Sequence, residues 1–453
     1  MDYIPVASVA IFLVTLVLML KRPKRINLGV AAGIGAIASL LLGTVTIGDA
    51  FVAFGNIWNA ALAFVGIVTM SVTLDVMGFF KWAALAVARL AHGNGIRLYF
   101  FTALLTAVVS ILFANDSAVL ILTPIVMEMI GELKMSRENG LAYLFGAGLI
   151  ADTAAMPLIT SNPVNIVSAD FFRYTFIEHL IFMTPVAIVT VIISILVVYL
   201  FFRKRIPKTY SAATVEELYR SNPRPMWLRT SMATLIVIDA GYVVASFNRI
   251  PVSIVICAGG FFLLALYGMS YRKHNPSNTE EKRGVLHVLR KVNWDILIFM
   301  IAIFLVVQGL RNAGAVTFYA SLFVNALALP SALSVLVPSL IVTVSASAMN
   351  NWPMTMLGLL SIQEAIVVNG LSAQASTSLI FANIIGNNLG PHFFPLGSLA
   401  ILMWLGTMRR KGLTIRLIDY LKVGSILSIV EVAAASLILW LELFFIAPLS
   451  IVL

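Results

Sequence analysis

Long, nearly uninterrupted runs of apolar residues constrain this chain more than any other feature. A helix needs roughly 20 apolar residues to cross the hydrocarbon core of a bilayer. Runs of that length recur along the 453 residues, of which only 11% are charged, so the fold must be surrounded by lipid. We expect a retained first helix and full crossings near residues 3–20, 27–46, 56–76, 141–163, 179–202, 226–246, 251–270, 294–311, 374–396 and 423–446.

Two further apolar stretches, at about 98–130 and 331–368, are too long for one crossing and are interrupted by polar, Asn-containing segments. Irregular backbone at membrane depth is tolerated only where protein or a water-filled cavity surrounds it. We therefore expect both stretches to be re-entrant hairpins. The predicted fold is an all-α polytopic membrane protein with about ten transmembrane helices and two such hairpins.

The positive charge is clustered between the apolar runs. Lys and Arg favour the cytoplasmic side of a membrane, and one topology, with both chain ends outside, brings every cluster to that side. The clusters lie at 21–25, 81–97, 203–205, 272–291 and 409–411. This pattern is typical of topology signals, so no nucleic-acid partner is expected despite the net charge of +10.

A cytoplasmic linker at 203–225 is expected to separate the membrane halves 1–202 and 226–453, with a short surface helix at Thr214–Leu218.

Sliding the chain against itself by 236 residues also indicates two repeats, with cores at about 56–202 and 294–446. The matched pairs are Trp58 with Trp294, Gly78 with Gly314, Asn115 with Asn351, Asp152 with Asn388, and Asn162 with Ser398.

Under the predicted topology, Trp58 begins a helix directed inward and Trp294 begins one directed outward. The two repeats therefore have inverted topology, an arrangement typical of secondary carriers. Such carriers bind their substrate near the midplane, where discontinuous helices expose backbone groups.

Polar residues interrupt four apolar segments at related places in the two repeats, at 113–117, 151–162, 347–353 and 386–398. Ionisable and amide side chains are costly in lipid, so these clusters indicate a cavity; the alternative is hydrogen bonding that holds the bundle together. The candidate substrate-binding residues are Asn115, Thr153, Ser161, Asn162, Ser347, Asn350, Asn351 and Asn388. We expect the coupling proton on Asp116 and Asp152, because a partly desolvated carboxylate can be protonated near neutral pH; the alternative is that one of them, such as Asp152, only caps a broken helix in the ionised state.

Several longer motifs resemble a known family. They are Phe113-Ala114-Asn115-Asp116 with Leu122-Thr123-Pro124, Ala151-Asp152-Thr153-Ala154 with Pro157-Leu158-Ile159, the segments Asn162–Phe172 and Leu310–Gly314, Met349-Asn350-Asn351, and Leu396–Ala400. Over nearly the whole chain the sequence resembles the arsenite and antimonite efflux carriers, the ArsB family of the ion transporter superfamily. The resemblance implies proton-driven export of arsenite and antimonite across the inner membrane, with a cytosolic metalloid-stimulated ATPase as an optional partner.

Two residues depart from the family pattern, which commonly has Asp and Lys where this chain has Asn388 and His392. The joint change suggests that a neutral or switchable pair replaces an ion pair. Arsenous acid is an uncharged triol, so its site needs hydrogen-bonding partners such as Asn, Ser and Thr rather than a fixed charge. The single cysteine, Cys257, cannot form a three-thiolate metalloid site and is expected only to pack.

Other ionisable residues lie within apolar runs. Asp239 is either a structural hydrogen-bonding residue or a second proton carrier, and His392 is either a titrating group or a neutral imidazole. Glu431 and Glu442 lie in the last helix, outside the repeat, and a structural role is expected for them.

The alternatives differ in substrate and in class. A sodium-coupled carboxylate carrier or a sodium/proton carrier of the same superfamily is less favoured, because no Lys or Arg falls in the four breaks to bind an anion. An intramembrane aspartyl protease using Asp116 and Asp152 would leave the repeat unexplained. No phosphate-binding loop occurs, and neither enzymatic activity, a cofactor nor a bound metal is expected.

Overall fold

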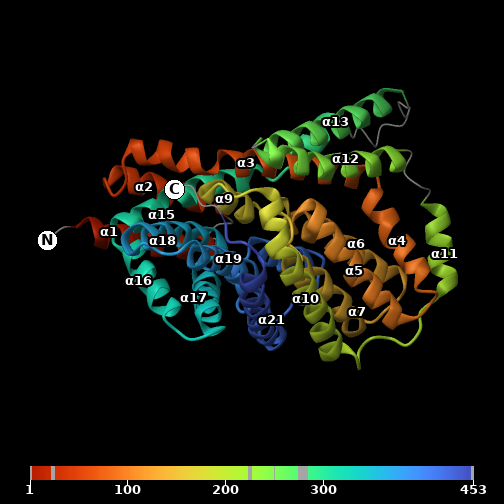
Figure 1. The fold of residues 1–453 in the computed structure, drawn as a ribbon. Coiled ribbons are helices and arrows are strands. Elements are labelled where there is room, and N and C mark those ends of the chain that lie inside the picture. The colour runs from red at the N-terminus through yellow and green to blue at the C-terminus, as the bar shows by residue number, and fades with distance from the viewer. Residues whose placement is uncertain (1–2, 22–25, 223–226, 249, 274–283, 450–453) are drawn as a thin grey trace.

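The computed structural model describes residues 3–21, 26–222, 227–248, 250–273 and 284–449 (Figure 1). Within these ranges all regular structure is helical, apart from one isolated bridge between Asn94 and Thr209. The basic cluster at 22–25 and parts of the expected cytoplasmic segments, 223–225 and 274–283, lie outside the described residues.

The first half contains the helices that precede and include the first repeat. They are α1 (Ile4–Lys21), α2 (Leu28–Leu41), α3 (Ile47–Val76), α4 (Phe79–Leu90), α5 (Gly95–Phe113), α6 (Asn115–Glu132), α7 (Arg137–Phe145), the π-helix η2 (Gly146–Ile150), α8 (Ala151–Thr153), the 3-10 turn η3 (Ile159–Ser161), α9 (Pro163–Phe172) and α10 (Phe176–Phe202).

The second half repeats the same order of elements after the linker helix α11 (Ala212–Ser221). It comprises α12 (Leu228–Phe247), α13 (Val252–Lys273), α14 (Val285–Lys291), α15 (Trp294–Asn312), α16 (Ala315–Leu327), α17 (Leu333–Met349), α18 (Asn351–Asn369), α19 (Ala373–Leu389), the 3-10 turns η4 (Gly390–His392) and η5 (Pro395–Gly397), α20 (Leu399–Arg410) and α21 (Leu417–Phe445).

Backbone conformation at matching positions supports the repeat. Gly78 and Gly314 both have positive φ, 81° and 85°, and precede α4 and α16. Ala114 (φ 64°, ψ 152°) separates α5 from α6, and Asn350 (φ 80°, ψ 149°) separates α17 from α18. The predicted hairpin tips are therefore real helix breaks, and both are made by the same unusual backbone conformation.

One predicted helix start is wrong. Trp58 lies within α3, which begins at Ile47, because Thr46 and Asp49 form a capping box that starts the helix earlier. In the second half the corresponding region is divided into α14 and α15, and Trp294 does begin α15.

Seven described helices are long and apolar enough to span a bilayer: α3, α5, α10, α12, α13, α15 and α21. Shorter apolar helices, including α1, α2, α16 and α17, accompany them. The first arm of the first hairpin, α5, reaches spanning length, whereas its counterpart α17 does not. Helix length therefore leaves the re-entrant interpretation as a prediction.

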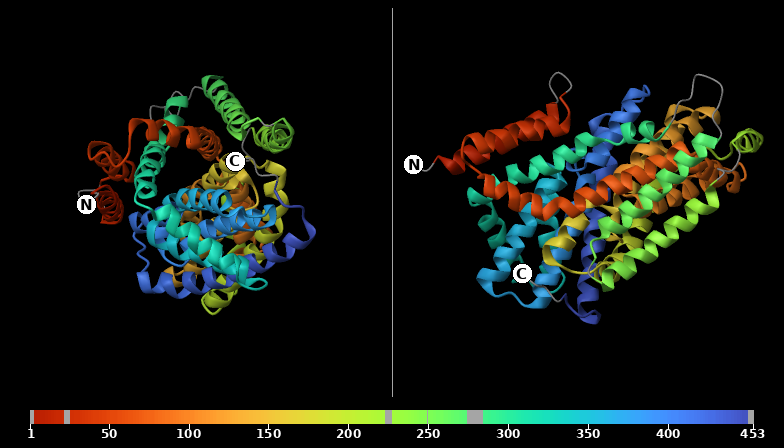
Figure 2. Two further views of the ribbon diagram at one scale, coloured as in Figure 1. Left: turned by 60° about the vertical axis from the view of Figure 1, so that its left-hand side comes forward. Right: turned by 90° about the horizontal axis from the view of Figure 1, so that it is seen from above.

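Long helices packed in pairs form the body of the protein. α3 packs along α13, α15 along α2, α17 along α19, and α10 along α21. The right-hand view of Figure 2 shows the α12 and α13 pair beside α3 at the periphery. The broken elements α8, η3, η4 and η5 are enclosed by these pairs, since nearly all of their residues are buried.

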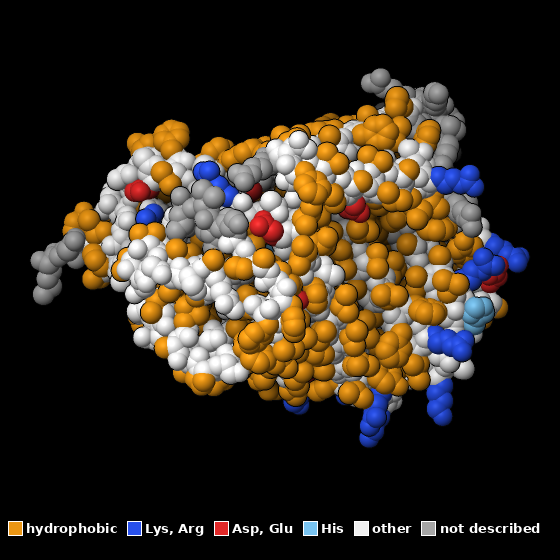
Figure 3. Space-filling model, viewed as in Figure 1, with side chains coloured by type: hydrophobic (Ala, Val, Ile, Leu, Met, Phe, Trp, Pro, Cys, Tyr) orange, Lys and Arg blue, Asp and Glu red, His pale blue; other side chains and the backbone are white. Residues whose placement is uncertain are grey.

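The outer surface is largely apolar. Figure 3 shows a broad hydrophobic face over the helices, with Lys and Arg gathered mainly at its right-hand and lower edges. The linker helix, predicted at Thr214–Leu218, is α11; Ser211 caps it, and Arg89 of α4 contacts its Glu216 at 2.8 Å. The linker is thus held against the first half.

Candidate functional site

The first broken helix passes through α7, η2 and α8 and then loses regular structure between Ala154 and Leu158. Polar side chains satisfy the carbonyl groups that this break leaves free. The Ser110 hydroxyl donates to the Ala151 carbonyl, and the Asn165 amide donates to the carbonyls of Ala155 and Leu158 at 2.9 and 3.2 Å. The break is therefore stabilised by side-chain hydrogen bonds within the protein, and all of its residues except the partly exposed Leu158 are buried.

The carbonyl groups left free in the second broken helix also accept hydrogen bonds from side chains, mainly from α21. Ser428 donates to the carbonyl of Leu389 at 2.9 Å, and the hydroxyl of Tyr420 donates to that of Pro391 at 3.1 Å. Ser347 of the second hairpin donates to Gly390 at 2.6 Å. Each hairpin is thus joined to the broken helix of its own half by a serine.

Three asparagines connect the two broken helices directly. The Asn162 amide donates to Oδ1 of Asn388 at 2.9 Å, and the Asn388 amide donates to Oδ1 of Asn165 at 3.0 Å. All three are buried. Residues more than 220 positions apart are joined here, so the two halves share one polar core.

Asp152 is the centre of a second connection between the halves. Its Oδ1 accepts hydrogen bonds from the Asn115 amide at 2.6 Å and from the Ser398 hydroxyl at 3.2 Å. Its Oδ2 lies 3.9 Å from Nε2 of His392. The carboxylate therefore contacts the first hairpin and both ends of the second break.

His392 links Asp152 to the last helix. Its Nδ1 lies 2.8 Å from Oε2 of Glu431, and the other oxygen of Glu431 accepts from the Thr153 hydroxyl at 2.8 Å. Asp152, His392 and Glu431 are at most 2% exposed. Asn388 and His392 hydrogen-bond to different residues. They therefore do not form a bonded pair with each other that would take the place of an ion pair.

Several buried polar atoms of this region have no hydrogen-bond partner within the described part of the chain. They include Oδ1 of Asn115, Oδ1 of Asn351, Oδ2 of Asp152 and Nε2 of His392. Unpaired buried polar atoms are costly, and each of these can accept or donate a hydrogen bond. The unpaired atoms in this part of the core are therefore available for hydrogen bonds with a hydroxyl-bearing ligand or with water.

The side chains of other predicted site residues form hydrogen bonds with the backbone. Ser161 donates to the carbonyl of Ile111 at 2.7 Å, and Ser347 donates to Thr343 and Gly390. Asn350 caps α18 and donates to Leu396 at 3.1 Å. These contacts stabilise the breaks.

The remaining candidates lie in different places. Asp116 is buried in the first turn of α6, close enough to Asp152 for their charges to interact. Asp239 is half-buried on α12, in the peripheral pair with α13, and is not joined to the central cluster by the described hydrogen bonds. Cys257 lies on α13, where its thiol donates to the Leu62 carbonyl of α3 at 3.4 Å.

Sequence reasoning missed three members of the cluster: Asn165, Ser398 and Glu431. Asn165 lies one helical turn after Asn162, so helical periodicity could have identified it. Ser398 was matched to Asn162 in the repeat but was not among the site candidates. Glu431 was expected to be structural, although an ionisable residue within an apolar helix is itself a signal for function.

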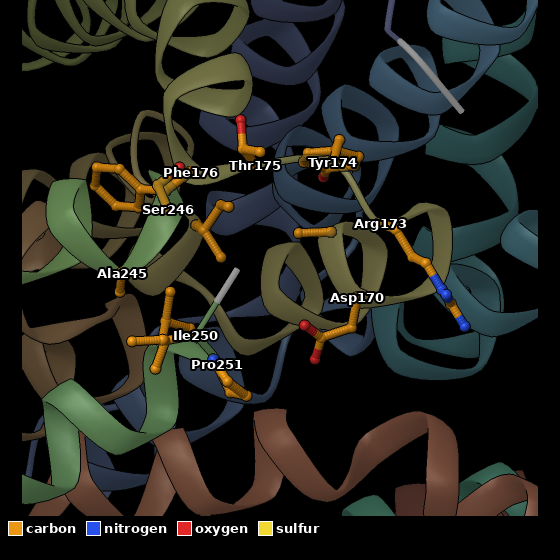
Figure 4. Close-up of a pocket in the computed structure, with 12 residues that line it drawn as sticks. Asp170, Arg173, Tyr174, Thr175, Phe176, Ala245, Ser246, Ile250 and Pro251 are labelled. Atoms are coloured by element: carbon orange, nitrogen blue, oxygen red, sulfur yellow. The ribbon is translucent and has the colours of Figure 1, made fainter. Parts of the chain in front are cut away.

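A cavity of about 300 Å³ adjoins this core (Figure 4). It lies between the α9–α10 connection, with Asp170, Arg173 and Phe176, and the α12–α13 connection, with Ser246 and Pro251. Ile159 of η3, next to the first break, also lines it. The Asp170 carboxylate accepts two 2.8 Å hydrogen bonds from Asn59 of α3, which fixes one wall.

Comparisons with known proteins agree with this architecture. The sequence model of a family described as arsenical pump membrane protein matches residues 7–443. An arsenical pump membrane protein of Escherichia coli K12 is 40% identical over 422 residues, covering 93% of this chain and 95% of that protein. A putative arsenical pump membrane protein of Bacillus subtilis is 26% identical over 427 residues, covering 91% and 93%.

Among solved structures, the YdaH transporter of Alcanivorax borkumensis is similar in fold. The TM-score is 0.56, at 16% sequence identity, and the match covers 87% of each chain. This likeness concerns the fold alone.

Proposed function

Because the chain belongs to the arsenical pump membrane protein family, we propose that this membrane transporter exports arsenite and antimonite from the cytoplasm in exchange for protons. The observation that carries the proposal is the pair of repeat-related asparagines, Asn115 and Asn351. Both are buried, and the amide oxygen of each has no hydrogen-bond partner in the described part of the chain.

The chemistry of these atoms suits an uncharged triol. Arsenous acid presents hydroxyl groups that donate hydrogen bonds, and an amide oxygen accepts them without a charge that would need neutralising. A site that leaves acceptors unpaired when empty gains selectivity for ligands that supply the missing donors. In this proposal Asn115 and Asn351 bind substrate hydroxyls, while Asn162 and Asn388 hold the broken helices beside the site.

The proton is assigned to Asp116 and Asp152. Both carboxylates are buried and close enough for their charges to interact. Two nearby buried carboxylates cannot easily both be ionised. A proton taken up from the outer side can therefore reside on this pair until the site faces the cytoplasm.

The proposed setting is the inner membrane, with both chain ends outside and the linker at 203–225 on the cytoplasmic side between the halves 1–202 and 226–453. A metalloid-stimulated ATPase, as an optional partner, would dock on that side. A sodium-coupled carboxylate carrier or a sodium/proton carrier remains the alternative; the absence of Lys and Arg from all four breaks argues against an anionic substrate.

Everted membrane vesicles test the proposal. Vesicles containing the protein should accumulate labelled arsenite and antimonite when a proton gradient is imposed, and accumulation should cease when a protonophore collapses the gradient. A sodium gradient that drives uptake of a carboxylate instead, with no uptake of metalloid, would establish the alternative.

A further inference from the structure

Glu431 belongs to a continuous set of buried polar contacts that extends through both halves of the protein. From α21 it contacts Nδ1 of His392 in η4, and the opposite nitrogen of His392 faces Asp152 of α8 at 3.9 Å. Asp152 in turn accepts a hydrogen bond from Asn115 of α6. A carboxylate, an imidazole and a second carboxylate therefore lie in a row within the core.

Few other ionisable groups face this row. Asp116 interacts with Asp152, and Tyr420 of α21 lies close enough to interact with both carboxylates while its hydroxyl donates to Pro391. Within the described ranges no Lys or Arg forms an ion pair with Asp152, His392 or Glu431. Among the described residues, therefore, no fixed positive charge balances the two carboxylates.

Charge balance then requires protons. With both carboxylates ionised and the imidazole neutral, the row has a charge of −2, and two bound protons make it neutral. Burying net charge without a partner is strongly unfavourable. The row can therefore be held in the core only if it binds protons, and losing them raises its free energy in this conformation.

The two contacts hold protons differently. Nδ1 of His392 and Oε2 of Glu431 lie at hydrogen-bonding distance, so a proton is shared between them. At the other end, Nε2 of His392 and Oδ2 of Asp152 are 3.9 Å apart, and neither has a hydrogen-bond partner among the residues that the structure describes. A proton there is held less tightly and can be exchanged with water or released when a ligand binds.

We propose that Glu431, His392 and Asp152 form the proton-carrying unit of this transporter, with Glu431 as a required member. The inference rests on the proton-coupled export proposed above and deepens it. It extends the proton path beyond the Asp116–Asp152 pair and makes it a property of both halves.

The position of the unit explains how proton movement is coupled to conformational change. Asp152 belongs to the first half, whereas His392 and Glu431 belong to the second. Any movement of one half against the other changes the 3.9 Å separation, and with it the affinity for the proton. Each proton passes from external water to the unit and from there to cytoplasmic water, and no bond of the substrate is broken.

Reconstituted vesicles with an entrapped pH indicator test this role. Glu431→Gln keeps the shape and some hydrogen bonding but cannot carry a proton. We expect metalloid-evoked proton movement to fall at least about tenfold, while exchange of labelled arsenite across vesicles at equal pH on both sides continues. Glu431→Asp, which restores the carboxylate, should regain part of the proton movement.

Glu442→Gln is the matched control, since Glu442 is a buried carboxylate on the same helix whose oxygens have no hydrogen-bond partner within the described ranges. It should move protons as the unaltered protein does. If Glu431→Gln does not purify as a folded species, the same two measurements on His392→Gln decide the matter.

The possible results separate the two levels of the proposal. Two results would overturn the role of Glu431 and leave proton-coupled export intact. One is unaltered proton movement in Glu431→Gln, and the other is an equal loss of arsenite exchange and of proton movement in a folded Glu431→Gln variant. Metalloid exchange without proton movement in the unaltered protein overturns the coupling itself.

Discussion

Asn162 of the first half donates a hydrogen bond to Asn388 of the second half across 2.9 Å, in a region where both side chains are buried. The Asn388 amide continues the connection to Asn165. The two broken helices are therefore joined by neutral amides. Neutral amides bond to each other without requiring a proton or a counter-ion.

Removing this amide connection should destabilise the protein. Asn162→Ala and Asn388→Ala each leave buried groups unpaired, at a cost of about 1–3 kcal/mol. The loss of unfolding free energy in the double variant should be smaller than the sum of the losses in the two single variants, because both single changes break the same hydrogen bond. Thermal unfolding of the purified protein measures the effect, with Asn248→Ala on the exposed end of α12 as a control. Strict additivity would show that the two side chains do not interact.

Replacing Asn115 or Asn351 with Ala should weaken metalloid binding. Each change removes an acceptor for a substrate hydroxyl, worth about 1–3 kcal/mol or roughly 5- to 150-fold in affinity. The apparent affinity for arsenite in vesicle uptake is the measurement. Unchanged affinity in both variants would place the substrate elsewhere, and the same assay on Asn248→Ala gives the baseline.

Asp116→Asn and Asp152→Asn should impair accumulation driven by a proton gradient. The larger loss is expected for Asp152→Asn, because the Asp152 carboxylate has hydrogen-bonding partners in both halves and faces His392. Uptake measured over a range of external pH gives the result. If both variants accumulate metalloid with the pH dependence of the unaltered protein, neither carboxylate carries the coupling proton, and Asp239 or His392 becomes the next candidate.

Cys257→Ala should leave export nearly unchanged. The thiol lies between α13 and α3, where it donates to the Leu62 carbonyl at 3.4 Å, and it is outside every break. Vesicle uptake normalised to the amount of protein is the measurement. Loss of most transport at a normal protein level would indicate that a thiol takes part in metalloid recognition.

The same cysteine-free background allows the topology to be mapped. Single cysteines at 139 and 409 should be labelled only from the cytoplasmic side, and one at 170 only from outside. Asp170 borders the cavity shown in Figure 4, so this position also reports whether that cavity opens outward. Labelling of position 139 by an impermeant reagent from outside would contradict the first hairpin and the inverted topology.

Much of the fold could be predicted because lipid imposes a simple rule on the backbone. A polar residue within a long apolar run indicates an enclosed break, and Ala114 and Asn350 do separate helices at the predicted tips. The start of α3 was missed because a capping box acts locally: Thr46 and Asp49 begin the helix well before the apolar run. Patterns of hydropathy do not record such short-range bonds.

The candidate site was predictable only in part. Asn115, Asp152, Asn162 and Asn388 lie within recognisable breaks, and the structure joins them in pairs. Glu431 contacts Thr153, 278 residues away, and comparison of the repeats offered no counterpart to identify it. Contacts between distant helices depend on how the halves pack, which no local pattern specifies.

The backbone at Ala114 and Asn350 has a mechanical consequence. Both residues have positive φ with ψ near 150°, a region that side chains other than hydrogen strongly disfavour, at a cost of about 1–3 kcal/mol each. Asn350 offsets part of this cost by capping α18, whereas Ala114 has no side-chain bond to offer. The backbone of the first hairpin therefore holds more uncompensated conformational strain than that of the second. Any displacement that lets residue 114 adopt a favoured conformation releases this strain energy and favours the movement.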